Sequence, residues 1–180
     1  MIDNNAALQA FIEQGNSPKF VYFWGHQKSK NGISKSCFSQ WFDAPFTDKN
    51  KRFATAEHYM MYAKATLFND HDIAAKVLTC RHPNEAKKLG RQVKNFDEQL
   101  WNAERFNIVV KANLLKFAQN PELKAYLLGT SNRVIVEASP VDKIWGVGLA
   151  EDNPLIVDPK NWQGLNLLGY ALMVVREELA

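Results

Sequence analysis

The chain has 180 residues, of which 46% are hydrophobic, and this favours one globular domain over residues 1–180 rather than a disordered or repetitive protein. Its net charge of +3, from 22 basic and 19 acidic residues, lacks the clustered basic excess that is typical of proteins binding duplex nucleic acid.

The first two thirds of the chain predict mostly helices. Apolar residues that recur every three or four positions indicate helices, whereas short runs of aromatic and β-branched residues indicate strands. In chain order, we expect a helix, a strand, a loop, an extended segment and a turn over residues 4–14, 20–24, 26–36, 37–42 and 43–51. Five helices are then predicted over residues 55–68, 70–79, 82–91, 97–118 and 122–128.

The last third returns to a small β element before a final helix. We expect a strand, a glycine-rich turn, a loop and a helix over residues 133–137, 145–148, 149–163 and 165–179. No segment has the composition of a linker that would divide the chain. The elements together predict a mainly α fold with a minor β part.

Targeting and redox signals are those of an intracellular protein. The opening residues carry no basic and apolar leader, and no apolar run approaches the length of a membrane span. Cys37 and Cys80 form no Cys-x-x-Cys motif, which favours reduced cysteines over a disulfide or a zinc site. We therefore expect a cytoplasmic protein with no membrane association.

Cofactor signatures are also missing from the sequence. The four histidines have no metal-ligand spacing, and Gly146-Val-Gly148 fits neither a phosphate-binding loop nor a dinucleotide fingerprint. We therefore expect no metal and no cofactor, and a site built from carboxylates, a lysine and tryptophans.

Glu57 and Lys64 form the first candidate cluster. They are seven residues apart on a predicted helix, so both lie on one side of it, two turns apart. Taken alone, the pattern favours the polar rim of an amphipathic helix, although the spacing also permits both groups to enter one cleft.

Asp142 and Trp145 form the second cluster, beside Gly146 and after the strand that ends at Glu137. Loops that follow strands often carry functional residues, but Asp142 is also suited to capping a turn and Trp145 to the core. Trp101 is a core residue by default, and a buried Asn166 needs partners from either the backbone or a ligand.

These clusters, taken in order, resemble the YbiA-like (NADAR) family from about Phe20 to Leu179. The matching stretches are Phe38-Ser-Gln-Trp41, Ala56-Glu-His-Tyr-Met-Met-Tyr-Ala-Lys64, Leu89-Gly-Arg91, Trp101, Lys116-Phe117, Glu137, Asp142-Lys-Ile-Trp-Gly146 and Gly164-Leu-Asn-Leu-Leu-Gly169 with Arg176. The resemblance implies a mainly α orthogonal arrangement with a few short strands, and hydrolysis of N-glycosides.

The resemblance also implies roles for individual residues. Glu57 is expected to be the acid/base group, and Asp142 to stabilise the ribosyl cation or orient water. Lys64 is expected to neutralise the substrate phosphate, to hold Glu57, or to form a Schiff base with a ring-opened ribose. The expected substrate-binding residues are Trp41, Trp101 and Trp145 for stacking, Arg91 for phosphate, and Gly146 and Asn166.

Three functions follow from the resemblance. The first is an N-glycosidase that acts on phosphorylated ribosylamino-pyrimidine intermediates of riboflavin biosynthesis and releases ribose 5-phosphate. The second removes ADP-ribose from modified guanine in nucleic acid, and the third is a non-catalytic module that binds nucleotide or ADP-ribose. Two carboxylates argue against the third, and the modest net charge favours a small substrate. Phe38-Ser-Gln-Trp41 replaces a commoner Ser-Asn-Phe, which leaves the substrate branch open. We expect no obligate protein partner.

Overall fold

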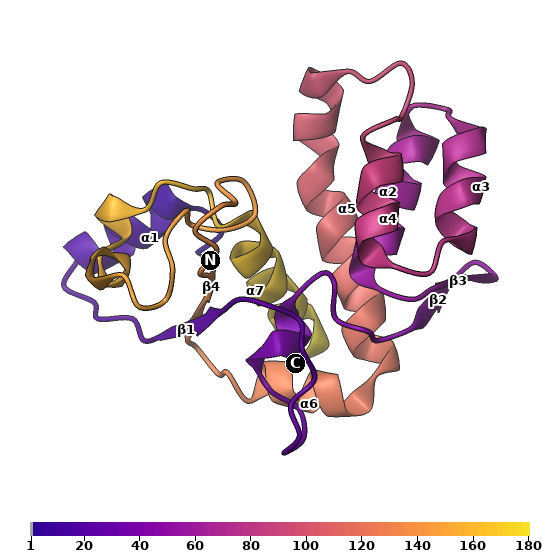
Figure 1. Cartoon of the computed structure of the whole chain (residues 1–180). Helices are drawn as coiled ribbons and strands as arrows, with labels where there is room; N and C mark the ends of the chain where they lie inside the picture. Colours follow the sequence, from indigo (N-terminus) through magenta and orange to yellow (C-terminus); the bar gives the residue numbers. More distant parts are fainter. Residues whose placement is uncertain (1) are drawn as a thin grey trace. The chain divides into compact units, whose positions relative to one another are not determined.

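The computed structural model describes residues 2–180, which form two compact units. The terminal unit combines the residues up to Ser39 with Glu122–Ala180, and the central unit is Gln40–Pro121. The described residues contain seven α-helices and four short strands, so the predicted mainly α fold is confirmed (Figure 1). The single domain and the orthogonal arrangement of the helices stay predictions.

The terminal unit is built around two parallel strands. Its strands are β1 (Phe20–Phe23) and β4 (Val134–Glu137), and its α-helices are α1 (Asn5–Glu13), α6 (Pro121–Leu128, of which only Pro121 belongs to the central unit) and α7 (Leu167–Leu179). Its three short 3-10 helices span Lys35–Phe38, Pro154–Val157 and Pro159–Asn161. β1 and β4 pair with Phe20 opposite Val134, and α7 packs against β4 (Figure 1). Burial of Val134, Ile135 and Val136 explains why β4 is apolar throughout its length.

Gly169, in the first turn of α7, allows this helix to approach β4 closely. A Cβ atom at this position would overlap the backbone carbonyl of Ile135 and the side chain of Asn166. We expect Gly169→Ala to lower the free energy of unfolding by about 3 kcal/mol, because overpacking of this kind forces backbone shifts. Urea denaturation measures the loss, with Gly129→Ala as the control because its Cβ would meet nothing closer than 3.3 Å. Equal stability of both variants would contradict the close approach.

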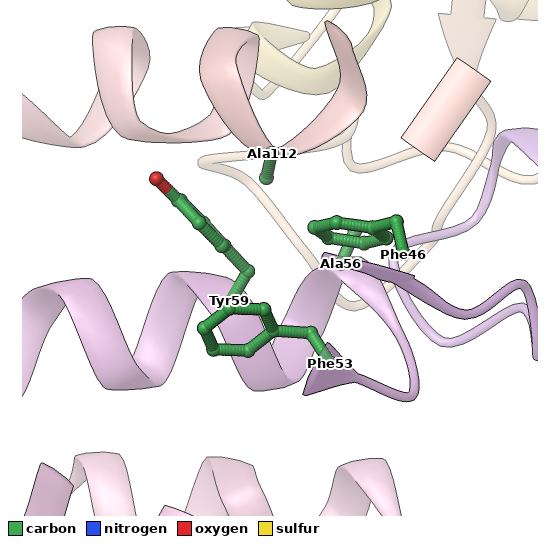
Figure 2. Packing of buried hydrophobic residues seen from close by; sticks show 5 residues of the cluster. All are labelled: Phe46, Phe53, Ala56, Tyr59 and Ala112. Carbon is green, nitrogen blue, oxygen red and sulfur yellow. The ribbon is translucent and has the colours of Figure 1, made fainter. Parts of the chain in front are cut away.

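The central unit consists of a hairpin and four helices. Its elements are β2 (Phe46–Asp48), β3 (Lys51–Phe53), α2 (Ala56–Leu67), α3 (His71–Thr79), α4 (Pro83–Gly90) and α5 (Glu98–Gln119). α2 packs against each of the other three helices. Figure 2 shows part of the core, where the rings of Phe46, Phe53 and Tyr59 gather near Ala112 of α5.

All predicted helices and both predicted strands are present, but three segments differ from prediction. The predicted loop over residues 149–163 contains the two 3-10 helices Pro154–Val157 and Pro159–Asn161. Residues 35–38 form a 3-10 helix where an extended segment was predicted to begin at residue 37. A tight turn buries the adjacent Cys37 and Phe38 together, whereas a strand would direct them to opposite faces. The predicted turn over residues 43–51 contains β2 and the start of β3, which are joined by Lys49 and Asn50 with positive φ angles of 45° and 66°.

Candidate active site

Glu57 lies in the first turn of α2 and is almost fully buried, with 4% of its surface exposed. The helix begins here because the Thr55 hydroxyl accepts a hydrogen bond from the backbone N–H of His58. The backbone N–H of Glu57 donates to the carbonyl of Gln40 over 2.9 Å. The backbone that carries this carboxyl group therefore belongs to a fixed helix start rather than to a loop.

Lys64 lies in the last turn of α2, about 10 Å from Glu57 along the helix axis. Its ammonium group is half-buried, 4.5 Å from the centre of the Phe96 ring and 5.4 Å from that of Trp101. Burial, and secondly the positive charge of Arg91, lower the pKa of Lys64 below its ordinary value. The amine is thus more readily deprotonated than a surface lysine, as a nucleophile requires.

Two further predicted site residues act on this amine: the Trp101 ring faces it, and the charge of Arg91 lowers its pKa. Arg91 is exposed at the C-terminal end of α4, and Trp101 is half-buried on α5. The Trp41 ring is also half-buried in the central unit, next to residues other than Lys64. It meets the His82 ring edge-on at 6.3 Å, and the Lys87 ammonium lies 5.8 Å from its centre.

The remaining predicted site residues belong to the terminal unit. Asp142 Oδ1 accepts hydrogen bonds from the backbone N–H groups of Ile144 and Trp145, over 2.9 and 2.8 Å. This is the turn-capping role that the sequence also allowed. Gly146 is required by packing, because a Cβ atom would lie 2.8 Å from the carbonyl oxygen of Glu137.

Asn166 is fully buried and joins the start of α7 to β4. Its Oδ1 accepts from the backbone N–H of Glu137, and its Nδ2 donates to the carbonyl of Ile135, both over 3.0 Å. The sequence left open whether the partners of Asn166 are backbone groups or a ligand, and in the structure they are backbone groups. The substrate-binding role of Asn166 stays a prediction.

Three further buried polar residues of the central unit are Gln40, Asn113 and Lys116. In the sequence, Gln40 and Lys116 were noted only within the matching stretches, and none of the three was given a role of its own. Asn113 and Lys116 are fully buried on α5, and the Lys116 ammonium lies 5.1 Å from the Phe117 ring. The available signal was their position on the apolar side of an amphipathic helix, where polar groups are rare. Asn113 in particular recurs with the apolar residues of that helix.

Within residues 2–180, no helix combines the length and the apolar character that a membrane span needs. The same residues contain no group of three or more histidine, cysteine, aspartate or glutamate side chains placed to hold a metal ion.

The profile of the NADAR domain matches residues 22–180. "N-glycosidase R617" of Acanthamoeba polyphaga mimivirus is 44% identical over 165 residues, covering 89% of this chain and 96% of that protein. "Riboflavin biosynthesis protein PYRR, chloroplastic" of Arabidopsis thaliana is 33% identical over 138 residues, which cover 74% of this chain but only 20% of that protein.

A solved structure of the Escherichia coli protein YbiA has the same fold. It superimposes with a TM-score of 0.70 at 27% identity, covering 91% of this chain and 86% of YbiA. The profile match and the viral relative each extend over most of the chain, so the resemblance found in the sequence is confirmed: the protein belongs to the NADAR family.

Proposed function

We propose that this NADAR-family N-glycosidase hydrolyses the bond between a phosphorylated ribose and an amino-pyrimidine intermediate of riboflavin biosynthesis, releasing ribose 5-phosphate. The observation that carries the proposal is the pair on α2, a buried carboxyl at Glu57 and an amine of lowered pKa at Lys64. The likeness to N-glycosidase R617 supports the bond type, and the likeness to PYRR supports the pathway.

Glu57 is the proposed acid. Cleavage of an N-glycosidic bond leaves positive charge on the ribose and negative charge on the departing nitrogen, so protonation of that nitrogen lowers the barrier. The backbone of Glu57 is fixed by the helix start at Gln40 and Thr55, and such a preorganised group needs little reorganisation before the proton is transferred.

Lys64 is the proposed nucleophile of the same cleavage, which it carries out on the ring-opened substrate while Glu57 supplies the proton for the departing nitrogen. A ribosylamine opens to an imine, the neutral Lys64 amine adds to its C1 atom, and the heterocyclic amine departs after taking up a proton. Water then adds to the new lysine imine and releases the ribose as its aldehyde, which restores the amine. Its lowered pKa supports this role over that of a simple phosphate-binding cation.

The surrounding residues are proposed to bind the substrate. Arg91 is exposed and its charge acts on Lys64, which suits the 5-phosphate, and the Trp101 ring suits stacking on the ribosylated heterocycle. Asp142 and Trp145 belong to the terminal unit, and their roles stay predictions.

An assay with two substrates tests the proposal. Purified protein is incubated with a phosphorylated ribosylamino-pyrimidine, read as ribose 5-phosphate, and separately with a DNA oligonucleotide carrying ADP-ribosyl-guanine, read as restored guanine. We expect turnover of the first, in keeping with a net charge of only +3. Turnover of the oligonucleotide alone would assign the protein to ADP-ribose removal, and turnover of neither would favour a binding module.

A further inference from the structure

Two buried amides of the central unit each keep an unused hydrogen-bonding group. Gln40 is 7% exposed and Asn113 is fully buried. Asn113 Nδ2 donates to Gln40 Oε1 over 2.8 Å and to the carbonyl of Val109 over 2.9 Å. Gln40 Nε2 and Asn113 Oδ1 have no hydrogen-bond partner among the residues that the structure describes.

The Val109 carbonyl determines the orientation of both amides. It can only accept, so Asn113 must turn its NH₂ group toward it, and the same NH₂ group then requires the oxygen of Gln40. Rotating the Gln40 amide by half a turn would bring two donors together, and rotating the Asn113 amide would bring acceptors together. One donor, at Gln40, and one acceptor, at Asn113, are therefore the groups that remain.

Leaving such groups unsatisfied is costly. A buried donor or acceptor without a partner destabilises a protein by about 1–3 kcal/mol, and native structures contain few of them. A donor and an acceptor retained together in one buried cluster point to a ligand that supplies the matching acceptor and donor.

The position of the amides indicates which part of the substrate they meet. The carbonyl of Gln40 accepts from the backbone N–H of Glu57, so the amide pair is anchored to the helix turn that carries the proposed acid. Glu57 must come within hydrogen-bond reach of the departing nitrogen. The part of the substrate closest to the two amides is therefore the heterocycle rather than the phosphate.

We propose that Gln40 and Asn113 recognise the lactam edge of the departing heterocycle, meaning a ring C=O next to a ring N–H. Gln40 Nε2 donates to the ring carbonyl, and Asn113 Oδ1 accepts from the ring N–H. This inference rests on the proposed function and deepens it, because it names the chemical feature for which the heterocycle is selected. A heterocycle that lacks either group leaves a buried amide unpaired and is rejected.

Binding of the free heterocycle tests this selection without any turnover. Calorimetric titration compares a triaminopyrimidinone with its derivative methylated at the lactam nitrogen, using the whole chain with Glu57 intact. We expect the unmethylated compound to bind at least about tenfold more tightly, since one buried hydrogen bond to Asn113 is lost on methylation.

Gln40→Glu is the sharpest variant, because it keeps the oxygen that Asn113 uses and replaces only the unused donor with an acceptor. We expect it to weaken binding of the unmethylated compound by about tenfold or more. Gln119→Glu is the matched control, since Gln119 is an exposed amide of α5 bonded to Thr47. If Gln40→Glu does not fold, Gln40→Met removes the same donor without adding charge.

Three results would overturn the inference: no binding of the unmethylated compound, equal affinity for both compounds, or unchanged affinity in the folded Gln40 variant. Failure of the proposed function is a separate result, because it is read from ribose 5-phosphate release. If the protein binds the lactam selectively but releases no sugar, the inference on recognition stands and the proposed reaction is contradicted.

Discussion

Glu57→Gln should lower kcat for ribose 5-phosphate release by about 10²–10⁴-fold, the usual contribution of a general acid. The amide has the shape of the carboxyl group but supplies no proton of suitable acidity to the departing nitrogen. Single-turnover measurements at saturating substrate give the rate of the chemical step directly, and we expect substrate affinity to change much less than this rate.

The matched control is Glu122→Gln, which alters an exposed glutamate that also lies in the first turn of a helix. It should leave the rate unchanged, so that a general loss of helix stability is distinguished from a loss of chemistry. Thermal melting of both variants verifies that they fold. Full activity of Glu57→Gln would show that Glu57 is not the acid. It would then also remove the argument that Gln40 lies near the departing heterocycle.

Replacing Lys64 with arginine should lower kcat by on the order of 10³-fold or more, as expected for the loss of a covalent nucleophile. Arginine keeps the positive charge but stays protonated, so it can bind phosphate and cannot form an imine. Cyanoborohydride added during turnover should reduce the lysine imine to a stable amine. Mass spectrometry should find the sugar phosphate attached at Lys64 in the wild-type protein and at no residue in Lys64→Arg.

The pH dependence separates this role from simple phosphate binding. Only the neutral amine attacks, so the rate should rise with pH through the pKa of Lys64, which lies below its ordinary value of 10.5. Arg91→Gln removes a positive charge that lowers this pKa, and the rise should therefore move to higher pH. Near wild-type activity of Lys64→Arg, with no trapped sugar, would instead assign Lys64 to phosphate binding.

Helix starts were predictable because their causes are local. Asp70 and Asp97 each accept a hydrogen bond from a backbone N–H three residues later, over 3.1 and 2.8 Å, as Thr55 does for α2. Such caps involve neighbouring residues only, so they are readable from the sequence without knowing the fold. The seven-residue spacing of Glu57 and Lys64 was readable for the same reason.

Strand pairing depended on distant segments. Phe20 pairs with Val134, more than a hundred residues later in the chain, and the hydrophobic pattern of either strand does not name its partner. The hairpin of β2 and β3 was missed because its strands are only three residues long each. It forms where Phe46 and Phe53 join the same core as Tyr59 (Figure 2).

The sequence by itself determined the helices, the family and the residue types of the candidate site. Only the tertiary structure decided the environment of those residues: the burial that lowers the pKa of Lys64, and the enclosure of Gln40 and Asn113 with one unused group each. Desolvation and hydrogen-bond satisfaction depend on everything that surrounds a side chain, and those surroundings come from segments far apart in the sequence.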